Sequence, residues 1–268
     1  MSRMLAFVAA QPAATADAIG DRLLTEFAAL AKVHSDGWGT AWLDPESGAV
    51  TCVSGAGTEV GSRRWFEALA GPASARMVYL RFASRGSPAS SENSQPFHRD
   101  GVAFQHNGLL APRDRLVDLL HPLERTRLLG TTDSEAYFAV VRDRVGAVRS
   151  GRTEWAASSL AVGVAEVRAR FPVACLNAML LSESGLRVVH STGTAPAPLA
   201  AFVDRGADLS SLPSGHGEDY NTLLSTTTDG GVRIVATTGV DQIGWMRLPG
   251  DTVFEVAHDE IRGVALDV

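Results

Sequence analysis

Cysteines and long apolar runs are both scarce in this chain. Its 268 residues include only two cysteines, Cys52 and Cys175, which lie far apart in apolar, strand-like runs. We expect both to be buried free thiols, as in a reducing cytoplasmic compartment, although two cysteines still allow a bridge. No apolar run approaches the roughly 20 residues that span a bilayer, and the first residues lack the regions of a signal peptide. The sequence therefore predicts a cytoplasmic protein with no membrane partner.

An excess of basic charge is missing as well. The chain carries 24 basic and 30 acidic residues, mixed along its length, for a formal charge of −6. This balance offers no electrostatic footprint for nucleic acid or for an anionic membrane. None of the seven histidines stands at a metal-ligand spacing from another histidine or a cysteine. The glycines at 55–61 depart from the dinucleotide fingerprint. We therefore expect no metal, nucleic-acid or dinucleotide site.

The most informative residue that is present is the second one. Ser2 follows Met1 and precedes the apolar, strand-like run Met4–Phe7. Cells commonly remove an initiator Met before a residue as small as Ser, and we expect Ser2 to lie at the mature N-terminus. Removal would put an α-amine, with an ordinary pKa of about 7.7–8.0, on the residue that carries the hydroxyl. Nucleophile and base would then be one residue. The alternative is a disordered chain start.

Apolar periodicity and turn residues predict a mixed order of helices and strands. Helical spacing predicts helices over 16–33, 62–69, 112–120, 132–148 and 153–170. Strands are predicted over 4–7, 40–43, 49–54, 76–83, 101–105, 174–181, 186–191, 220–227, 232–237, 252–256 and 261–266. The irregular segment 87–100 is expected beside a site, and 195–217 on the surface. The pattern places a helical middle between hairpins near both ends of the chain.

Three short motifs each allow a structural and a functional interpretation. Asn107-Gly108 follows a strand and is typical of a hairpin turn that needs positive φ. Thr132 and Glu135 form a capping-box pattern, so Asp133 between them fits a favourable charge at a helix N-terminus. The glycines on either side of Trp38 indicate a helix-to-strand connection, or a place where backbone approaches another group closely.

Taken together, Ser2, Arg81, Asn107-Gly108 and Asp133 suit one kind of substrate. A γ-glutamyl group carries an α-carboxylate, which matches the two-donor fork of Arg81, and an α-ammonium, which matches Asp133. Attack on its amide carbonyl creates an oxyanion. The Asn107 amide and the Gly108 N–H would donate to it, and losing one such donor costs roughly 2.7–4 kcal/mol.

This arrangement resembles the glutaminase domain of the class II glutamine amidotransferases. The resemblance rests on five segments in the family's order: His34–Gly39, Arg81–Gly86, Asn93–Phe97, Gln105–Gly108 and Thr132–Glu135. The C-terminal strands extend it to small stand-alone members, including the γ-glutamyl amide hydrolase of ergothioneine biosynthesis. It implies an α+β fold, the four-layer αββα sandwich of the N-terminal nucleophile hydrolases, and the helices in the middle and hairpins at both ends agree with this fold. It also implies a single glutamine amidotransferase type 2-like domain over 1–268, with no metal or organic cofactor.

The resemblance also assigns roles to individual residues. It implies catalytic roles for Ser2, Asn107 and Gly108, and substrate-binding roles for Arg81, Asp133, His106 and Trp38. Ser2 occupies the position of the family's catalytic cysteine, whose thiol ionises far more readily than a hydroxyl. Gln95 is a second departure, since many members have histidine there.

We therefore expect a glutaminase or γ-glutamyl amide hydrolase that forms a γ-glutamyl ester on its N-terminal residue. Two alternatives stay open. One is a γ-glutamyl-binding protein that has lost turnover, as a natural pseudoenzyme or an engineered cysteine-to-serine trap. The other is an ammonia-donating subunit of a synthase. The sequence leaves open the leaving amine, and whether a synthase partner or a homo-oligomer forms.

Overall fold

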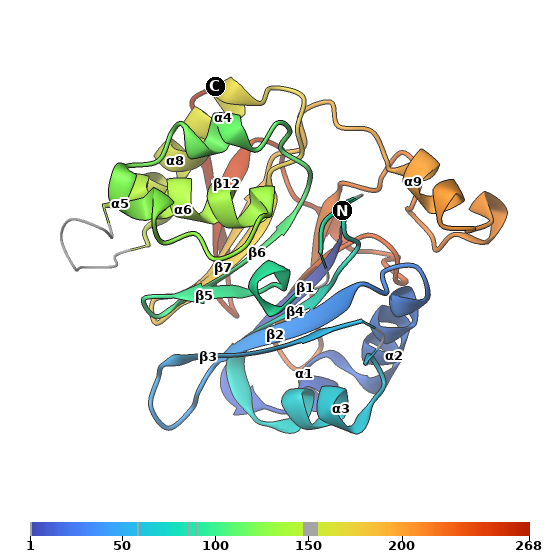
Figure 1. Ribbon diagram of the computed structural model, residues 1–268. Helices are drawn as coiled ribbons and strands as arrows, with labels where there is room; N and C mark the ends of the chain where they lie inside the picture. Colours follow the sequence, from blue (N-terminus) through green and yellow to red (C-terminus); the bar gives the residue numbers. More distant parts are fainter. Residues whose placement is uncertain (1, 58, 85, 89, 147–154) are drawn as a thin grey trace.

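The computed structural model describes residues 2–57, 59–84, 86–88, 90–146 and 155–268. The described strands form two antiparallel sheets that pack face to face (Figure 1). The seven strands of the first sheet are β1 (Arg3–Ala13), β2 (Gly37–Leu43), β3 (Val50–Ala56), β4 (Ala73–Leu80), β9 (Leu223–Thr227), β10 (Arg233–Thr237) and β11 (Met246–Arg247). The six strands of the second are β5 (Phe97–Arg99), β6 (Val102–Asn107), β7 (Asn177–Ser182), β8 (Gly185–His190), β12 (Thr252–Val256) and β13 (Ile261–Ala265).

The strand orders place β1 at the centre of the first sheet and β6 beside the edge strand β5 of the second sheet. The first sheet runs β11-β9-β10-β1-β4-β2-β3, and the second runs β13-β12-β8-β7-β6-β5. β1 pairs antiparallel with β4 in a register that sets Arg3 opposite Leu80. This pairing brings the start of the chain beside the end of β4, where Arg81 follows.

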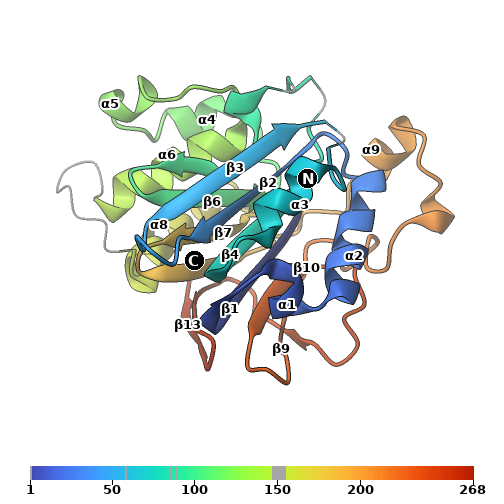
Figure 2. The ribbon, with the colours of Figure 1, turned by 90° about the horizontal axis from the view of Figure 1, so that it is seen from below.

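Helices cover the outer face of each sheet. The first sheet is covered by α1 (Thr15–Ile19), α2 (Asp21–Ala29) and α3 (Arg63–Ala70), as Figure 2 shows. The second is covered by α6 (Asp133–Val145) and α8 (Ala157–Arg170), with the short α4 (Asp114–Val117) and α5 (Pro122–Arg125) beside them. A further helix, α9 (Leu199–Asp204), projects at the right of Figure 1. The expected four-layer αββα sandwich is confirmed.

Alternation along β1 explains how one strand serves two cores. Met4 and Ala6 pack in the core between the sheets, whereas Leu5 and Phe7 pack under α1 to α3. Successive strand residues point to opposite faces, so a strand buried on both sides is apolar at nearly every position. Outside the second sheet, a third core lies beneath α6 and α8.

Several element boundaries differ from the sequence-based ones. The single helix predicted over 16–33 is two helices, because Gly20 adopts φ 86° and interrupts the hydrogen-bond ladder. The first strand continues to Ala13, well beyond the predicted run. The helix predicted over 132–148 ends at Val145, where Gly146 provides a left-handed C-cap. Residues 147–154, and with them the predicted start of the next helix, lie outside the described residues.

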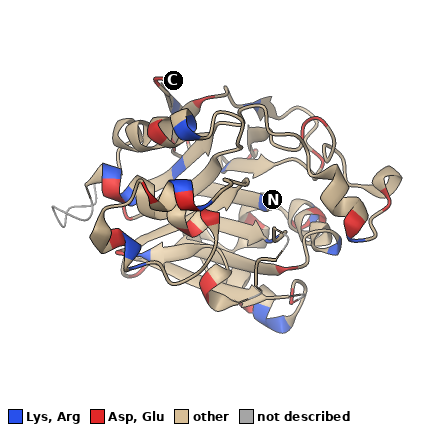
Figure 3. Cartoon of the chain, turned by 45° about the horizontal axis from the view of Figure 1, so that its top comes forward, with Lys and Arg blue, Asp and Glu red and all other residues tan. Residues whose placement is uncertain are grey.

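The charges are mixed and both thiols are free, as expected, but only one of the two cysteines is buried. Acidic and basic residues are interspersed on the face in Figure 3. Both cysteines are free; Cys175 is buried, but Cys52 is partly exposed. Burial raises the pKa of the Cys52 thiol to about 12 and that of Cys175 to about 11. Across the described ranges, no helix is both long and apolar enough to cross a membrane.

Candidate active site

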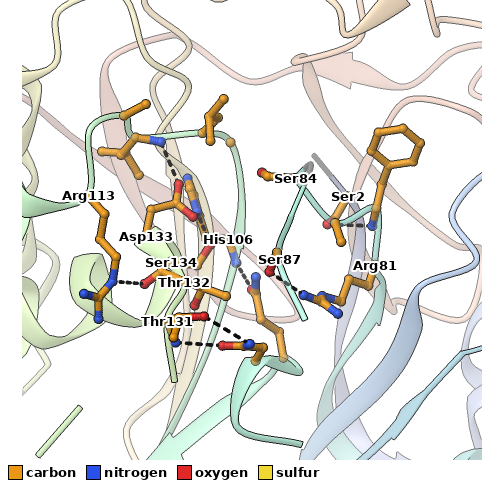
Figure 4. A pocket seen from close by; sticks show the side chains of 18 of the residues that line it. Ser2, Arg81, Ser84, Ser87, His106, Arg113, Thr131, Thr132, Asp133 and Ser134 are labelled. Atoms are coloured by element: carbon orange, nitrogen blue, oxygen red, sulfur yellow. Dashed lines mark hydrogen bonds between the residues drawn. The ribbon is translucent and has the colours of Figure 1, made fainter. Parts of the chain in front are cut away.

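A cavity of about 370 Å³ opens where the two sheets and the start of α6 meet. Ser2 and Arg81 lie on one side of this cavity and Asp133 on the other (Figure 4). Gly108 also lines it, directly after β6. These four residues, singled out from four separate parts of the sequence, therefore line one cavity, because strand pairing brings Ser2, Arg81 and Gly108 to the start of α6.

Both functional groups of Ser2 are held by hydrogen bonds. Its nitrogen donates to Asn107 Oδ1 at 2.7 Å, and its Oγ accepts from the Phe82 N–H at 3.2 Å. Ser2 Oγ also lies 2.6 Å from the Tyr79 hydroxyl. With 3% of its surface exposed, Ser2 is buried within the site.

Of the two polar atoms of the Asn107 amide, only the oxygen has a hydrogen-bond partner among the described residues. Its Oδ1 accepts from Ser2, whereas Nδ2 is buried and has no hydrogen-bond partner among the described residues. A buried N–H without a partner costs free energy unless a ligand supplies an acceptor. Nδ2 is therefore suited to stabilise a negative oxygen that forms beside Ser2.

Gly108 has a steric role rather than the expected conformational one. The positive-φ turn predicted for Asn107-Gly108 is wrong, because neither residue is left-handed. Instead, a Cβ on Gly108 would lie 1.9 Å from the Cys175 carbonyl oxygen. Only glycine lets the chain leave β6 so close to the neighbouring backbone.

Arg81 presents a buried, partly unsatisfied guanidinium. Its Nη2 donates to Ser87 Oγ at 2.9 Å and to the Pro88 carbonyl at 3.1 Å. Its Nη1 is buried without a hydrogen-bond partner, and Arg81 forms no ion pair with a carboxylate in the part of the chain that the structure describes. A carboxylate ligand would satisfy both its charge and its open donor.

Asp133 begins α6, so the structural interpretation of this motif holds in part. Thr132 Oγ1 accepts from the Glu135 N–H at 3.2 Å, as in a capping box. The Glu135 carboxylate, however, accepts from the Leu129 and Gly130 N–H groups rather than reaching back to Thr132. Asp133 Oδ2 accepts from the Leu110 N–H at 2.6 Å, and the same side chain lines the cavity. Asp133 therefore stands in the first turn of a capped helix and also presents its carboxylate to the cavity.

His106 lines the cavity, but the protein uses both of its ring nitrogens. Nε2 lies 3.1 Å from the Cys175 carbonyl, which can only accept, so Nε2 carries the proton. Burial lowers the pKa of His106, so the ring is neutral, and Nδ1 accepts from Ser134 Oγ at 2.9 Å. These contacts favour a positioning role over the substrate-binding role expected for His106.

Trp38 does not reach the cavity. Its indole packs edge-on against Trp65, with ring centroids 5.2 Å apart, in the core beneath α3. Its Nε1–H donates to Glu59 Oε2 at 3.2 Å. The position of Trp38 therefore gives no support to the expected substrate contact, and the side chain serves the outer core.

Tyr79 lines the cavity but was not singled out from the sequence. Tyr79 contacts Ser2 Oγ, and it stands two residues before Arg81, so strand alternation alone could have placed both on one face. Gln95 Oε1 accepts from the His106 N–H at 2.5 Å. A Cβ on Gly39 would lie 2.1 Å from the Gln95 carbonyl, which confirms that a glycine beside Trp38 allows a close backbone approach.

Asp36 and Arg205 hold the two residues that follow Arg81. Asp36 Oδ2 accepts from the Ala83 N–H at 2.6 Å and pairs with Arg205, just after α9. The Arg205 guanidinium also lies 4.0 Å from the centroid of the Phe82 ring. Arg85, in the same motif, lies outside the described residues. Among those that are described, no group of three or more potential ligand side chains is placed to hold a metal ion.

Comparisons with solved structures show the same fold. A class-II glutamine aminotransferase domain protein from Silicibacter pomeroyi superposes with a TM-score of 0.62 at 14% identity, covering 99% of this chain and 100% of the other. A predicted glutamine amidotransferase from Pseudomonas aeruginosa gives a TM-score of 0.54 at 15% identity, covering 97% and 98%. The B. subtilis glutamine phosphoribosylpyrophosphate amidotransferase gives 0.61 at 14% identity, but this chain spans only 49% of it while 99% of this chain is covered.

Sequence comparison gives the family. No curated protein matches the sequence significantly. The family model of the class-II glutamine amidotransferases matches residues 1–207, which include every cavity-lining residue discussed above. This chain belongs to the class-II glutamine amidotransferases.

Proposed function

We propose that this chain hydrolyses γ-glutamyl amides, with Ser2 as nucleophile and, after removal of Met1, its α-amine as base. The observation that carries the proposal is a pair of buried donors near Ser2, Arg81 Nη1 and Asn107 Nδ2, that have no hydrogen-bond partner among the described residues. Arg81 offers a place for the α-carboxylate, and Asp133 across the cavity offers one for the α-ammonium. The proposal takes residues 1–268 as one domain that works in the cytoplasm without a cofactor.

The reaction follows from these positions. The α-amine takes the Ser2 hydroxyl proton as Oγ bonds to the γ-carbonyl carbon, and the carbonyl electron pair moves onto oxygen beside Asn107 Nδ2 and Gly108. The oxyanion then collapses, the C–N bond breaks, and the α-ammonium gives its proton to the departing amine. Water attacks the resulting γ-glutamyl ester by the same route and releases glutamate.

The surroundings of the cavity favour an amine larger than ammonia. Two further cavities, of about 620 and 330 Å³, share Leu109 with the first, and one of them also shares Phe82 and Ala83. Leu109 is 47% exposed, so an apolar side chain stands at the junction. Glutamine hydrolysis would leave this space unused, whereas a substituted amide would fill it.

The size of the leaving amine can be tested at Leu109. Leu109→Asp should lower kcat/KM for γ-glutamyl-p-nitroanilide much more than for glutamine, because only the anilide ring reaches that side chain. Leu123→Asp is the matched control, since Leu123 is 58% exposed on α5 and outside all three cavities. Equal losses on both substrates would argue against a large amine and for an ammonia donor that works with a synthase.

A second candidate is a binding protein without turnover, and the hydroxyl in place of a thiol favours it. The two functions separate in one comparison. A hydrolase with Met1 removed should release glutamate from a γ-glutamyl amide, and Ser2→Ala should stop it. A binding protein should bind such compounds unchanged, while Ser2→Cys should gain turnover because a thiolate forms more readily. Failure of Ser2→Cys to bind or hydrolyse any γ-glutamyl amide would exclude both.

A further inference from the structure

The hydroxyl of Tyr79 has a single hydrogen-bond partner among the described residues, and that partner is the nucleophilic oxygen of Ser2, 2.6 Å away. We propose that Tyr79 is a catalytic residue that stabilises the Ser2 alkoxide as it forms, and so makes a serine competent where the family uses a thiol. This inference rests on the function proposed above. It adds a role for a residue that the family motifs did not single out.

The hydrogen bonds around Ser2 Oγ make Tyr79 a donor during attack. The Phe82 N–H already donates to Oγ at 3.2 Å. When the Ser2 proton moves to the α-amine, Oγ gains negative charge and can only accept. Burial raises the pKa of Tyr79, so its phenol keeps its proton and serves as a donor rather than a base. Two donors, one backbone and one phenolic, then converge on the alkoxide.

The scaffold fixes this contact. Tyr79 lies in β4, opposite Met4 of β1 on one side and Gly39 of β2 on the other. Its ring is buried in the core between the sheets, beside Met77. Because Ser2 leads directly into β1, the register of the β1–β4 pair sets the distance between phenol and nucleophile. No side-chain rearrangement is needed when the alkoxide forms, which is the condition for effective electrostatic stabilisation.

A serine benefits from such a donor more than a cysteine does. A thiol has an ordinary pKa of about 8.5 and forms its anion readily near neutral pH. An aliphatic hydroxyl is far less acidic, so stabilisation of its anion lowers the barrier more. The phenol proton is not transferred: it stays on Tyr79 while the Ser2 proton travels through the α-amine to the leaving amine. Charge and proton therefore balance without another reactant.

A double-mutant cycle tests the proposal. The parent, Tyr79→Phe, Ser2→Cys and the doubly substituted protein are assayed with Met1 removed, on glutamine and γ-glutamyl-p-nitroanilide. Tyr79→Phe should lower the parent's kcat roughly 100- to 1,000-fold, as for loss of one oxyanion donor. In the Ser2→Cys protein the loss should stay below about tenfold. KM and the acid limb of the pH profile should not move, because the base is the α-amine.

The matched control is Tyr137→Phe, which removes another fully buried hydroxyl, bonded to the Leu176 carbonyl at 3.3 Å. It should leave kcat unchanged. Equal losses from Tyr79→Phe in the parent and in Ser2→Cys would reduce Tyr79 to a packing residue and overturn the proposal. The proposal would also be overturned if the parent has no turnover while Ser2→Cys is active. In that case the assignment of γ-glutamyl hydrolysis to this site would still hold. Inactivity and absence of γ-glutamyl binding in all four proteins would refute the proposed function itself.

Discussion

Asn107→Asp should lower the rate of hydrolysis without greatly lowering the stability of the fold. The substitution keeps the oxygen that accepts from Ser2 N at 2.7 Å and replaces only Nδ2, which has no partner among the described residues. Folding should therefore lose little. Hydrolysis should fall at least 100- to 1,000-fold, roughly the value of one oxyanion donor, and further because a fixed negative charge repels the oxyanion.

The same substitution should alter the pH profile. A carboxylate beside the α-amine favours its charged form, which raises the pKa of the amine. The acid limb of the rate profile, set by the free amine, should then move to higher pH. Part of the lost rate would return as the pH rises, whereas the part due to the missing donor would not.

Asn177→Asp is the control, because Asn177 lies opposite Asn107 in the β6–β7 register and is equally buried. The protein uses both ends of its amide: Oδ1 accepts from the Ser191 N–H, and Nδ2 donates to the Asn221 carbonyl. Asn177→Asp should therefore lower the melting temperature, whereas Asn107→Asp should lower the rate. If Asn107→Asp instead unfolds the protein while the remaining fold-competent fraction hydrolyses normally, the oxyanion assignment is wrong.

Two further predictions concern ligand binding and acid stability. Arg81→Ala and Asp133→Asn should each weaken calorimetric binding of glutamate by roughly 1.5–3 kcal/mol, the usual value of a charge-assisted bond; unchanged affinity in both would remove the γ-glutamyl assignment. Burial lowers the pKa of His34, and it lowers that of His216 from 6.5 to about 3, with Arg3 adding repulsion. The unfolded chain binds these protons first, so the stability they contribute is complete above about pH 6.5 and is lost as the pH falls towards 3. Urea unfolding at pH 7.5 and 5.0 should show this loss, and His216→Gln should make it smaller.

The fold and most of the cavity were accessible from the sequence because their signals are local. Ser2, Arg81 and Asp133 stand at element ends, where short motifs mark them, and those ends meet in an αββα sandwich. Trp38 lies away from the cavity for a reason of geometry. In β2, successive residues face opposite sides, so Gly39 meets Gln95 while Trp38 points to the outer core. A motif shows that residues belong together without showing which face each takes.

Other features depended on contacts that no local pattern encodes. The steric need for Gly108 arises from the Cys175 carbonyl, 67 residues further along the chain. The α9 helix lies in a segment rich in Pro, Ala, Gly and Ser, where apolar periodicity gave no helical signal. Arg205 likewise contacts Phe82 and Asp36, which lie more than 100 residues before it in the sequence. Such features follow from tertiary packing, which overrides local propensity.

The residues proposed to bind the γ-glutamyl head and those that contact the nucleophilic oxygen are held by different hydrogen bonds. Substitution of Ser2 therefore tests the nucleophile separately from substrate binding. Arg81 is held by Ser87 and Pro88, and the Asp133 carboxylate by Leu110, so none of these contacts involves the nucleophile. Exchange of oxygen for sulfur at Ser2 should therefore leave affinity for the γ-glutamyl head intact and change only the ease of forming the anion. The Phe82 N–H and the Tyr79 hydroxyl both contact Ser2 Oγ. The ratio of the rates of the serine and cysteine proteins therefore measures how much these two donors favour a hydroxyl nucleophile over a thiol. A scaffold built only for a thiol would leave this ratio insensitive to Tyr79.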